Sequence, residues 1–225
     1  MCIFAVLLTC ACGGPRDPNG TTNRVRDGVM RVGVIEQPPF ASLANGKPSG
    51  VETQMVRALA EQMHSNVIWV PGSAPDLLDA VANDQLEIVI GGVSASTPWI
   101  KRVAITNGFY TDRLVVAAPP GAGTLRNLDN RRVAVKIGDA AAAYVRDQGG
   151  TPVFVRSLDQ ATGLVAAPEW QLPRLHRSSS GIVLRKLDHV WALPRGENGW
   201  LVQVEQFQRK WKPRIGPMLQ TETVR

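Results

Sequence analysis

A run of apolar residues that ends in two glycines and a group of hydroxyl side chains constrains this chain most. Residues 88–90 read Ile-Val-Ile, Gly91 and Gly92 follow, and Ser94 and Ser96 come next. A wholly apolar run is typical of a strand buried on both faces of a parallel sheet. Glycine lets the backbone approach a bound molecule closely, and open α/β sheets bind ligands beyond the carboxyl ends of their strands. The stretch therefore predicts a binding crevice, not a catalytic triad.

A second strand end points to the same crevice. Residues 32–35 form an apolar run that leads into Gln37, two prolines and Phe40. If both strands belong to one parallel sheet, their carboxyl ends meet at one edge. We therefore expect Phe40 to supply an aromatic wall beside the Gly92 turn.

The spacing of apolar residues predicts alternating strands and helices. In the part of the chain before residue 119, strands are expected at 31–35, 66–70 and 86–90. One helix is expected from Ser49, where Glu52 completes the spacing of a capping box, and another from Ser73. Such alternation indicates an α/β protein with mainly parallel sheets. Beyond a Pro- and Gly-rich break at 119–123, further strands are expected at 132–137, 152–155, 164–167, 182–184 and 189–193, and helices at 140–146 and 198–212.

The N-terminal residues resemble a bacterial lipoprotein signal. A short apolar run at 3–8 precedes Cys10 and Cys12, and a loop-like tether rich in Gly, Pro, Asn and Thr follows at 13–28. We expect residues 1–12 to be the signal and Cys12, or else Cys10, to carry the lipid, which would anchor an extracytoplasmic protein to the cell membrane, in the periplasm or at the cell surface. All 3 cysteines lie in this region. The alternative is a buried strand with incidental cysteines.

The net charge and the absence of known motifs reduce the classes of function that this chain can have. The formal net charge of +6 suits anionic surfaces, but we find no recognised nucleic-acid motif and expect no nucleic-acid partner. Nucleophile-elbow, metal-ligand and Walker patterns do not occur. The sequence therefore predicts no catalytic residue, no metal site and no cofactor.

Several segments together, by their order and spacing, resemble the polar-amino-acid class of periplasmic solute-binding proteins that serve ABC importers, extracellular solute-binding protein family 3. The matching segments are residues 31–34 with 38–40, 46–51, 86–92, 102–106 with 109–110, 128 with 132–135, and the last helix from 198. The resemblance implies a two-lobed periplasmic-binding-protein fold with two hinge strands, a small solute held between the lobes, an ABC permease as partner and a monomeric state. Lobe one would comprise residues 29–115 and 190–225, and lobe two residues 116–189.

The chain departs from the family where the solute is gripped. The resemblance places an arginine, which would hold an amino acid's carboxylate, at a position occupied here by Trp99. The expected Gly-Thr-Thr turn at a helix N-terminus reads Gly138-Asp139-Ala140, and the carboxylate of Asp139 would repel an anion. Only Glu169 matches the acidic partner of the α-amino group.

These departures indicate a polar or cationic, amino-acid-like solute, because aromatic walls with a carboxylate nearby suit a cation. The predicted ligand-binding residues are Phe40, Gly92, Ser94, Ser96, Trp99, Asp139 and Glu169. Core packing is the alternative role for Trp99 and for Trp170.

Two other functions stay open. One is a receptor or scaffold that keeps the fold and has lost the small-ligand clamp. The other is an enzyme resembling the dehydratases of this fold, in which Glu169 would carry a proton. We expect a binding protein and no enzyme.

Overall fold

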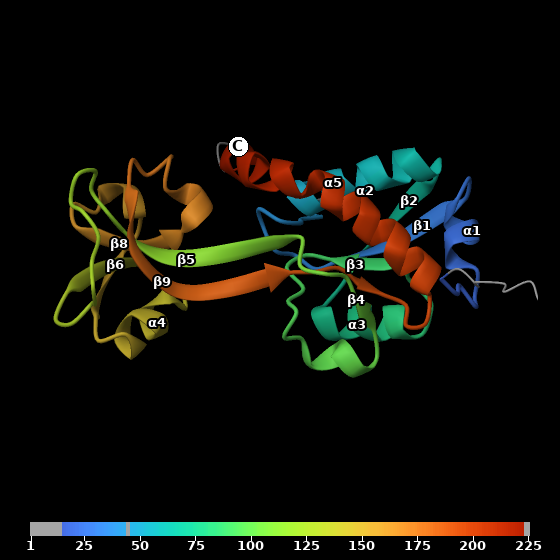
Figure 1. The fold of residues 1–225 in the computed structure, drawn as a ribbon, viewed down its shortest axis with the longest axis horizontal. Helices are drawn as coiled ribbons and strands as arrows, with labels where there is room; N and C mark the ends of the chain where they lie inside the picture. Colours follow the sequence, from blue (N-terminus) through green and yellow to red (C-terminus); the bar gives the residue numbers. More distant parts are fainter. Residues whose placement is uncertain (1–14, 44–45, 223–225) are drawn as a thin grey trace, which may run out of the picture.

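Two five-stranded sheets lie side by side along the long axis of the molecule, and two long strands run between them (Figure 1). The computed structural model describes residues 15–43 and 46–222. The predicted signal and both candidate lipidation sites, Cys10 and Cys12, lie outside these residues. No helix within the described ranges combines the length and the apolar character needed to cross a bilayer.

The first sheet has the strand order β2-β1-β3-β10-β4. Pairings of β1 with β2 and with β3 are parallel, and those of β10 with β3 and β4 are antiparallel. Helices α2 and α5 share one hydrophobic cluster with β1, and α3 packs in a second cluster on the other side. The elements of this lobe are α1 (Thr21–Val25), β1 (Val29–Val34), α2 (Val51–Met63), β2 (Asn66–Pro71), α3 (Ala74–Ala82), β3 (Ile88–Ile90), η2 (Pro98–Lys101), β4 (Ala104–Ile105), β10 (Ala192–Leu193) and α5 (Asn198–Glu222).

The second sheet has the order β7-β6-β8-β5-β9. Strand β6 pairs in parallel with β7 and β8, whereas β5 pairs antiparallel with β8 and β9. Its elements are β5 (Tyr110–Ala118), β6 (Arg132–Lys136), α4 (Ala141–Asp147), β7 (Thr151–Val155), η3 (Leu158–Gln160), β8 (Leu164–Pro168), η4 (Glu169–Gln171) and β9 (Ser178–His189). The two-lobed α/β architecture predicted from the sequence is confirmed, and both sheets are mixed.

The chain crosses between the sheets twice. It leaves the first sheet after Ile105 and enters the second at Tyr110, and it returns between His189 and Ala192. Strands β5 and β9 form one antiparallel ribbon, with Tyr110 opposite His189. The lobe limits expected from the sequence, 29–115 with 190–225 and 116–189, stay a prediction.

Three local predictions differ from the structure. Helix α2 has Gly50, not Ser49, at its N-cap, so no capping box forms, because the Glu52 side chain is used elsewhere. The strand expected at 182–184 begins earlier, at Ser178, and continues to His189 as β9, which Ser180 helps to hold by donating its hydroxyl to the Val116 carbonyl at 2.7 Å. Within the expected tether, residues 21–25 form α1, in which Thr21 and Val25 are buried.

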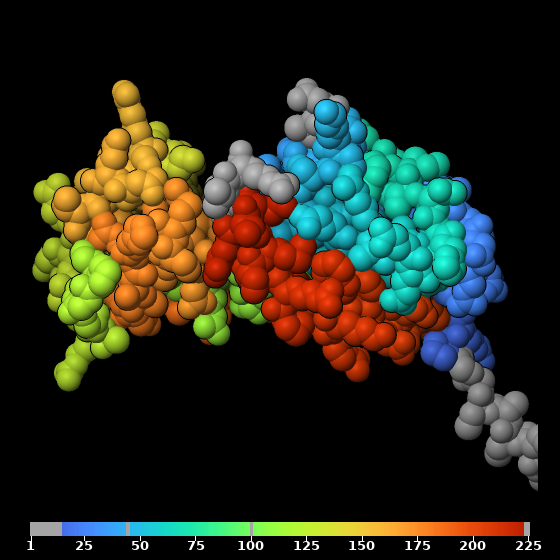
Figure 2. All heavy atoms as spheres, turned by 90° about the horizontal axis from the view of Figure 1, so that it is seen from above, coloured from blue at the N-terminus to red at the C-terminus, as the bar shows by residue number. Residues whose placement is uncertain are grey.

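Helix α5 is also longer than predicted. It continues past Pro213 and Pro217 to Glu222, although proline interrupts the hydrogen bonds of a helix interior. The fully buried side chains of Ile215 and Leu219 pack in the core of the first lobe. This burial explains why the helix continues. Seen from above, the far end of α5, in red, reaches the second lobe (Figure 2).

Candidate functional site

The turn after β3 is held open by backbone that only glycine accepts easily. Gly91 and Gly92 have φ of 104° and 72°. A Cβ atom at Gly91 would lie 2.0 Å from the carbonyl oxygen of Ile35. Two glycines at the end of a buried strand therefore allow a close turn at the sheet edge, as the sequence predicted.

A buried carboxylate supports this turn from behind. Glu52, fully buried in the first turn of α2, accepts hydrogen bonds from the backbone N–H of Gly91 at 2.9 Å and of Gly92 at 3.3 Å. The indole N–H of Trp191 donates to the same carboxylate at 3.1 Å. The Nδ1 atom of His189 lies 3.6 Å from it. Sequence reasoning missed this role for Glu52, and its one signal was a carboxylate at the start of the expected helix.

The two serines of the predicted site lie together on this turn. The hydroxyls of Ser94 and Ser96 are 2.7 Å apart, and the Ser94 hydroxyl also accepts the backbone N–H of Ser96 at 3.1 Å. Ser96 is exposed and Ser94 half-buried. Their polar atoms are therefore presented at the edge of the first sheet.

Backbone hydrogen bonds join the serine turn to the end of β9. The N–H of Ala95 donates to the carbonyl of Asp188 at 3.2 Å, and the N–H of Val190 donates to the carbonyl of Val93 at 3.0 Å. The turn is thus attached to the strand that enters the second lobe.

The two predicted aromatic walls lie in different surroundings. Phe40 is only 4% exposed, and its ring stacks on His189 with centroids 4.0 Å apart. Trp99 is half-buried against the hydrophobic cluster that contains Val93, and the Arg102 guanidinium lies 4.9 Å from its ring centroid. Trp99 therefore keeps part of its ring accessible, whereas Phe40 mainly supports His189.

The predicted residues of the second lobe are solvent-exposed. Asp139 accepts the backbone N–H of Ala141 at 2.8 Å, at the start of α4. The Glu169 carboxylate lies 3.7 Å from the guanidinium of Arg113, with nearly half of each side chain exposed. Among the described residues, no hydrogen bond or ion pair joins Asp139 or Glu169 to Phe40 or to the serine turn. The structure therefore groups the site residues of the first lobe and leaves these two apart.

Trp170, the remaining aromatic candidate, belongs to the core. It follows Glu169 in η4 and is 6% exposed in the hydrophobic cluster of the first lobe, together with Ile215 and Leu219 of α5. The alternative role that the sequence left open for Trp170, core packing, describes its environment.

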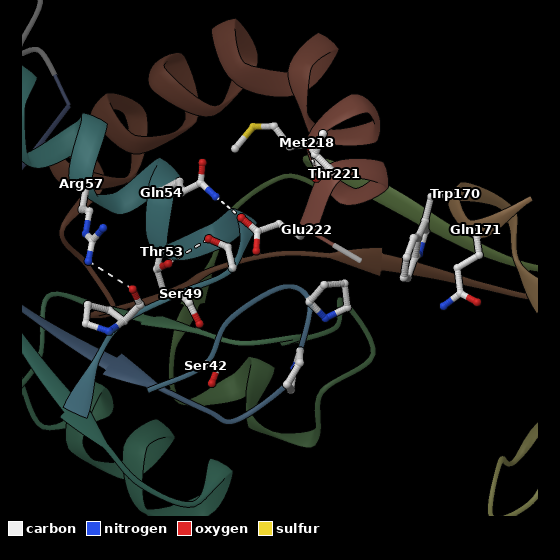
Figure 3. A pocket seen from close by; sticks show the side chains of 14 residues that line it. Ser42, Ser49, Thr53, Gln54, Arg57, Trp170, Gln171, Met218, Thr221 and Glu222 are labelled. Carbon is white, nitrogen blue, oxygen red and sulfur yellow. Dashed lines mark hydrogen bonds between the residues drawn. The ribbon is translucent and has the colours of Figure 1, made fainter. Parts of the chain in front are cut away.

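A cavity of about 1170 Å³ lies where α2, the end of α5 and η4 meet (Figure 3). Its polar groups include Gln54, which donates to the carboxylate of Glu222, and Arg57, which donates to the carbonyl of Pro48 at 3.1 Å. Of its lining residues, the sequence pointed only to Trp170, as a candidate aromatic wall. They are Pro38, Pro39, Ser42, Pro48, Ser49, Gly50, Thr53, Gln54, Arg57, Trp170, Gln171, Met218, Thr221 and Glu222.

Two ionisable side chains on the ribbon formed by β5 and β9 are half-buried, and burial shifts their pKa values. Burial raises the pKa of Asp112 on β5, and the neighbouring His189 and the indole of Trp170 act in the opposite direction. Burial, followed by the charges of Asp112 and Glu169, also raises the pKa of Tyr110. The start of the ribbon therefore has acidic groups from both β5 and η4.

Comparison with known proteins agrees with this architecture. A sequence profile of the bacterial extracellular solute-binding proteins, family 3, matches residues 30–213. The probable histidine-binding protein of Campylobacter jejuni is 20% identical over 140 residues, which are 60% of this chain and 55% of that protein. The chain thus aligns with only about half the length of this curated relative.

Solved structures share the fold at low identity. The Ancestral Cationic Amino Acid Solute Binding Protein has a TM-score of 0.67 at 15% identity, covering 91% of this chain and 97% of its own. A binding component of an ABC transporter from Wolinella succinogenes, complexed with lysine, has a TM-score of 0.57 at 16% identity, covering 85% and 94%. An ancestral cyclohexadienyl dehydratase has a TM-score of 0.59 at 17% identity, covering 83% and 88%. At such identities these structures show the fold alone.

Proposed function

Because the chain belongs to the bacterial extracellular solute-binding proteins, family 3, we propose that it captures a small polar or cationic, amino-acid-like solute for an ABC importer. The observation that carries this proposal is the turn of residues 91–96. Its glycine backbone, supported by Glu52, and its serine hydroxyls lie at the sheet edge beside the crossing ribbon. Polar groups held in place in this way are what a small-molecule site needs.

The charge of the proposed solute follows from Trp99 and the acidic groups. Trp99 stands where the family resemblance expects an arginine, so the chain lacks that fork for a carboxylate. Asp139 and Glu169 of the second lobe carry negative charge in exposed positions. Closure of the lobes would bring these carboxylates toward the turn, where they favour a cation over an anion.

The proposed solute class can be tested with pairs of compounds that differ by one carboxylate. Calorimetry would compare arginine with agmatine, lysine with cadaverine, and histidine with histamine on the unlipidated chain, in which Cys10 and Cys12 are both alanine. We expect the member without a carboxylate to bind more tightly in at least one pair. A charged hydrogen bond is worth about 1.5–3 kcal/mol, so the difference in that pair should reach about tenfold or more.

Other outcomes would support the rival functions. Tighter binding of the amino acid in every pair would contradict the cationic preference and keep the solute-binding role. Absence of binding by any amino acid or amine would support the scaffold. Chemical conversion of a bound compound would support an enzyme, and Glu169→Gln would then be the first variant to assay.

We further propose an anchored, extracytoplasmic location for this binding protein. The family is extracellular, and the Cys10 and Cys12 region resembles a lipoprotein signal. A lipid at the N-terminus would hold the monomer near its permease at the membrane surface.

A further inference from the structure

The buried carboxylate of Glu52 contacts most of the groups around the proposed binding turn. Its side chain has no exposed surface. It accepts the backbone N–H groups of Gly91 and Gly92 on the turn and the indole N–H of Trp191 just after the crossing. An ionised carboxylate is acceptor-only and has room for all of these donors. An amide at the same place would turn its NH₂ group toward some of them.

His189 adds a connection from the same carboxylate to the second lobe. It is the last residue of β9, and its ring is buried, with Nδ1 3.6 Å from the Glu52 carboxylate. Neither ring nitrogen has a hydrogen-bond partner among the described residues. The ring is held instead by aromatic contacts, with Phe40 at 4.0 Å between centroids and with Tyr110 and Phe109 at 6.0 and 6.4 Å.

The charged groups that face His189 come from two elements. They are Glu52 from α2 and Asp112 from β5. An imidazole 3.6 Å from the Glu52 carboxylate, with aromatic rings against it, is placed for an electrostatic contact and not for a hydrogen-bonded one. A buried charge without a partner costs far more free energy than a buried charge with one.

We propose that Glu52 is the positioning residue of the solute-binding turn and that its contact with His189 couples this turn to the strand that leads into the second lobe. The proposal rests on the function proposed above, because it assumes that the turn of residues 91–96 contacts the solute. Glu52 acts through Gly91 and Gly92 and does not touch the solute itself. A solute that binds at the turn would then act directly on the contact between Glu52 and His189 at the end of β9.

The chain offers a matched control for a merely structural effect. Glu87 is also a buried glutamate of the first lobe, 2% exposed, and its carboxylate pairs with Arg31 at 2.5 Å. It also accepts the backbone N–H of Arg31 at 2.7 Å. Glu87→Gln should therefore destabilise the lobe without reaching the turn.

The first test needs no solute. Amide hydrogen exchange, followed by NMR on the unlipidated chain under strongly native conditions, would compare Glu52→Gln, Glu52→Asp and Glu87→Gln with the parent. We expect Glu52→Gln to speed exchange at Gly91 and Gly92 by about tenfold or more beyond the average change in the first lobe, since a charged acceptor is lost. Glu52→Asp should restore part of the protection, and Glu87→Gln should change these amides no more than their neighbours. Equal acceleration across the lobe in Glu52→Gln would overturn the proposal.

The second test addresses the coupling to His189. A double-mutant cycle with Glu52→Gln and His189→Phe, measured by urea unfolding, compares the two single changes with the double change. We expect the double variant to lose less stability than the sum of the single losses, because no unpaired buried charge remains. Strict additivity would remove His189 from the proposal.

Solute binding separates this proposal from the proposed function. With agmatine and histamine as probes, Glu52→Gln should weaken affinity at least about tenfold while Glu87→Gln leaves it unchanged. If the parent binds neither probe nor any amino acid, the proposed function fails, and the exchange result still decides whether Glu52 holds the turn. Unchanged probe affinity in Glu52→Gln, with faster exchange at Gly91 and Gly92, would show that the turn does not position the solute.

Discussion

The carboxylate of Glu197 accepts a hydrogen bond of 2.9 Å from the backbone N–H of Asn19, a residue 178 positions earlier in the chain. A second hydrogen bond of 3.0 Å comes from the N–H of Thr21 at the start of α1. Glu197 precedes α5 directly, so a single side chain fastens the N-terminal segment to the start of the last helix.

This arrangement predicts a specific acid dependence of stability. Burial alone would raise the pKa of Glu197, but hydrogen bonds from Asp17, Asn19 and Thr21 outweigh it and lower the pKa from its ordinary value of 4.5 to about 2. A lowered pKa means that the folded state favours the charged carboxylate. Glu197 therefore contributes stability above its unfolded pKa of 4.5 and loses this contribution as the pH falls to about 2.

Urea unfolding between pH 6 and pH 2 would check the prediction for Glu197. We expect Glu197→Gln to be less stable than the parent at pH 6, and the difference to shrink steadily below about pH 4.5. Asp17 acts in the opposite direction, because burial and the neighbouring Glu197 raise its pKa, and Asp17→Asn would change the titration of Glu197 as well. A stability difference that is the same at every pH would contradict the assignment.

Trp170 should contribute to stability as a core residue. It is 6% exposed between the second lobe and the end of α5, so Trp170→Ala should cost about 3–5 kcal/mol, as large-to-small changes in a core do. Trp170→Phe should cost clearly less, because it fills part of the space. Thermal and urea unfolding of both variants would measure this. A loss below about 1 kcal/mol for Trp170→Ala would show that the contact is weak in solution.

Trp99 should have a mixed role. Because its ring is half-buried against the cluster around Val93, Trp99→Ala should destabilise the protein by about 1–3 kcal/mol, less than for a fully buried tryptophan. If the exposed part of the ring also contacts a cation, affinity for agmatine should fall several-fold in the same variant, since a cation–π contact is worth about 0.5–2 kcal/mol. Calorimetry below the melting temperature measures the loss of affinity separately from the loss of stability. If Trp99→Ala binds agmatine as tightly as the parent, Trp99 contributes to packing and does not contact the cation.

The lipid anchor makes the simplest cellular prediction. Cys12→Ala should move the protein from the membrane fraction to the soluble extracytoplasmic fraction, and Cys10→Ala should not, if Cys12 carries the lipid. The reverse pattern would identify Cys10. Unchanged fractionation of both variants would reject the anchor.

The architecture could be predicted because it depends on local periodicity and on the order of elements. In runs such as residues 88–90 every side chain is apolar, which is typical of strands buried on both faces of a sheet. Glycines at 91 and 92 mark a backbone turn that other residues adopt only with strain. These signals lie within a few residues of one another, so they can be recognised without knowledge of distant contacts.

Long-range contacts explain where the sequence predictions differed. Pro213 indicates a helix end by its own chemistry, yet burial of Ile215 and Leu219 continues α5 to Glu222. Residues 178–180 are serines, and only their pairing with β5 makes them part of a strand.

The sequence by itself determined the family, the two α/β lobes and the glycine turn after β3, because each rests on local pattern and spacing. Only the tertiary structure decided how that turn is supported. Glu52, His189 and Trp191 come from α2, the end of β9 and the crossing segment, and the chain separates Glu52 from Trp191 by 139 positions. Their meeting depends on packing of the whole first lobe, and the energy of a buried carboxylate depends on partners that no local pattern reveals.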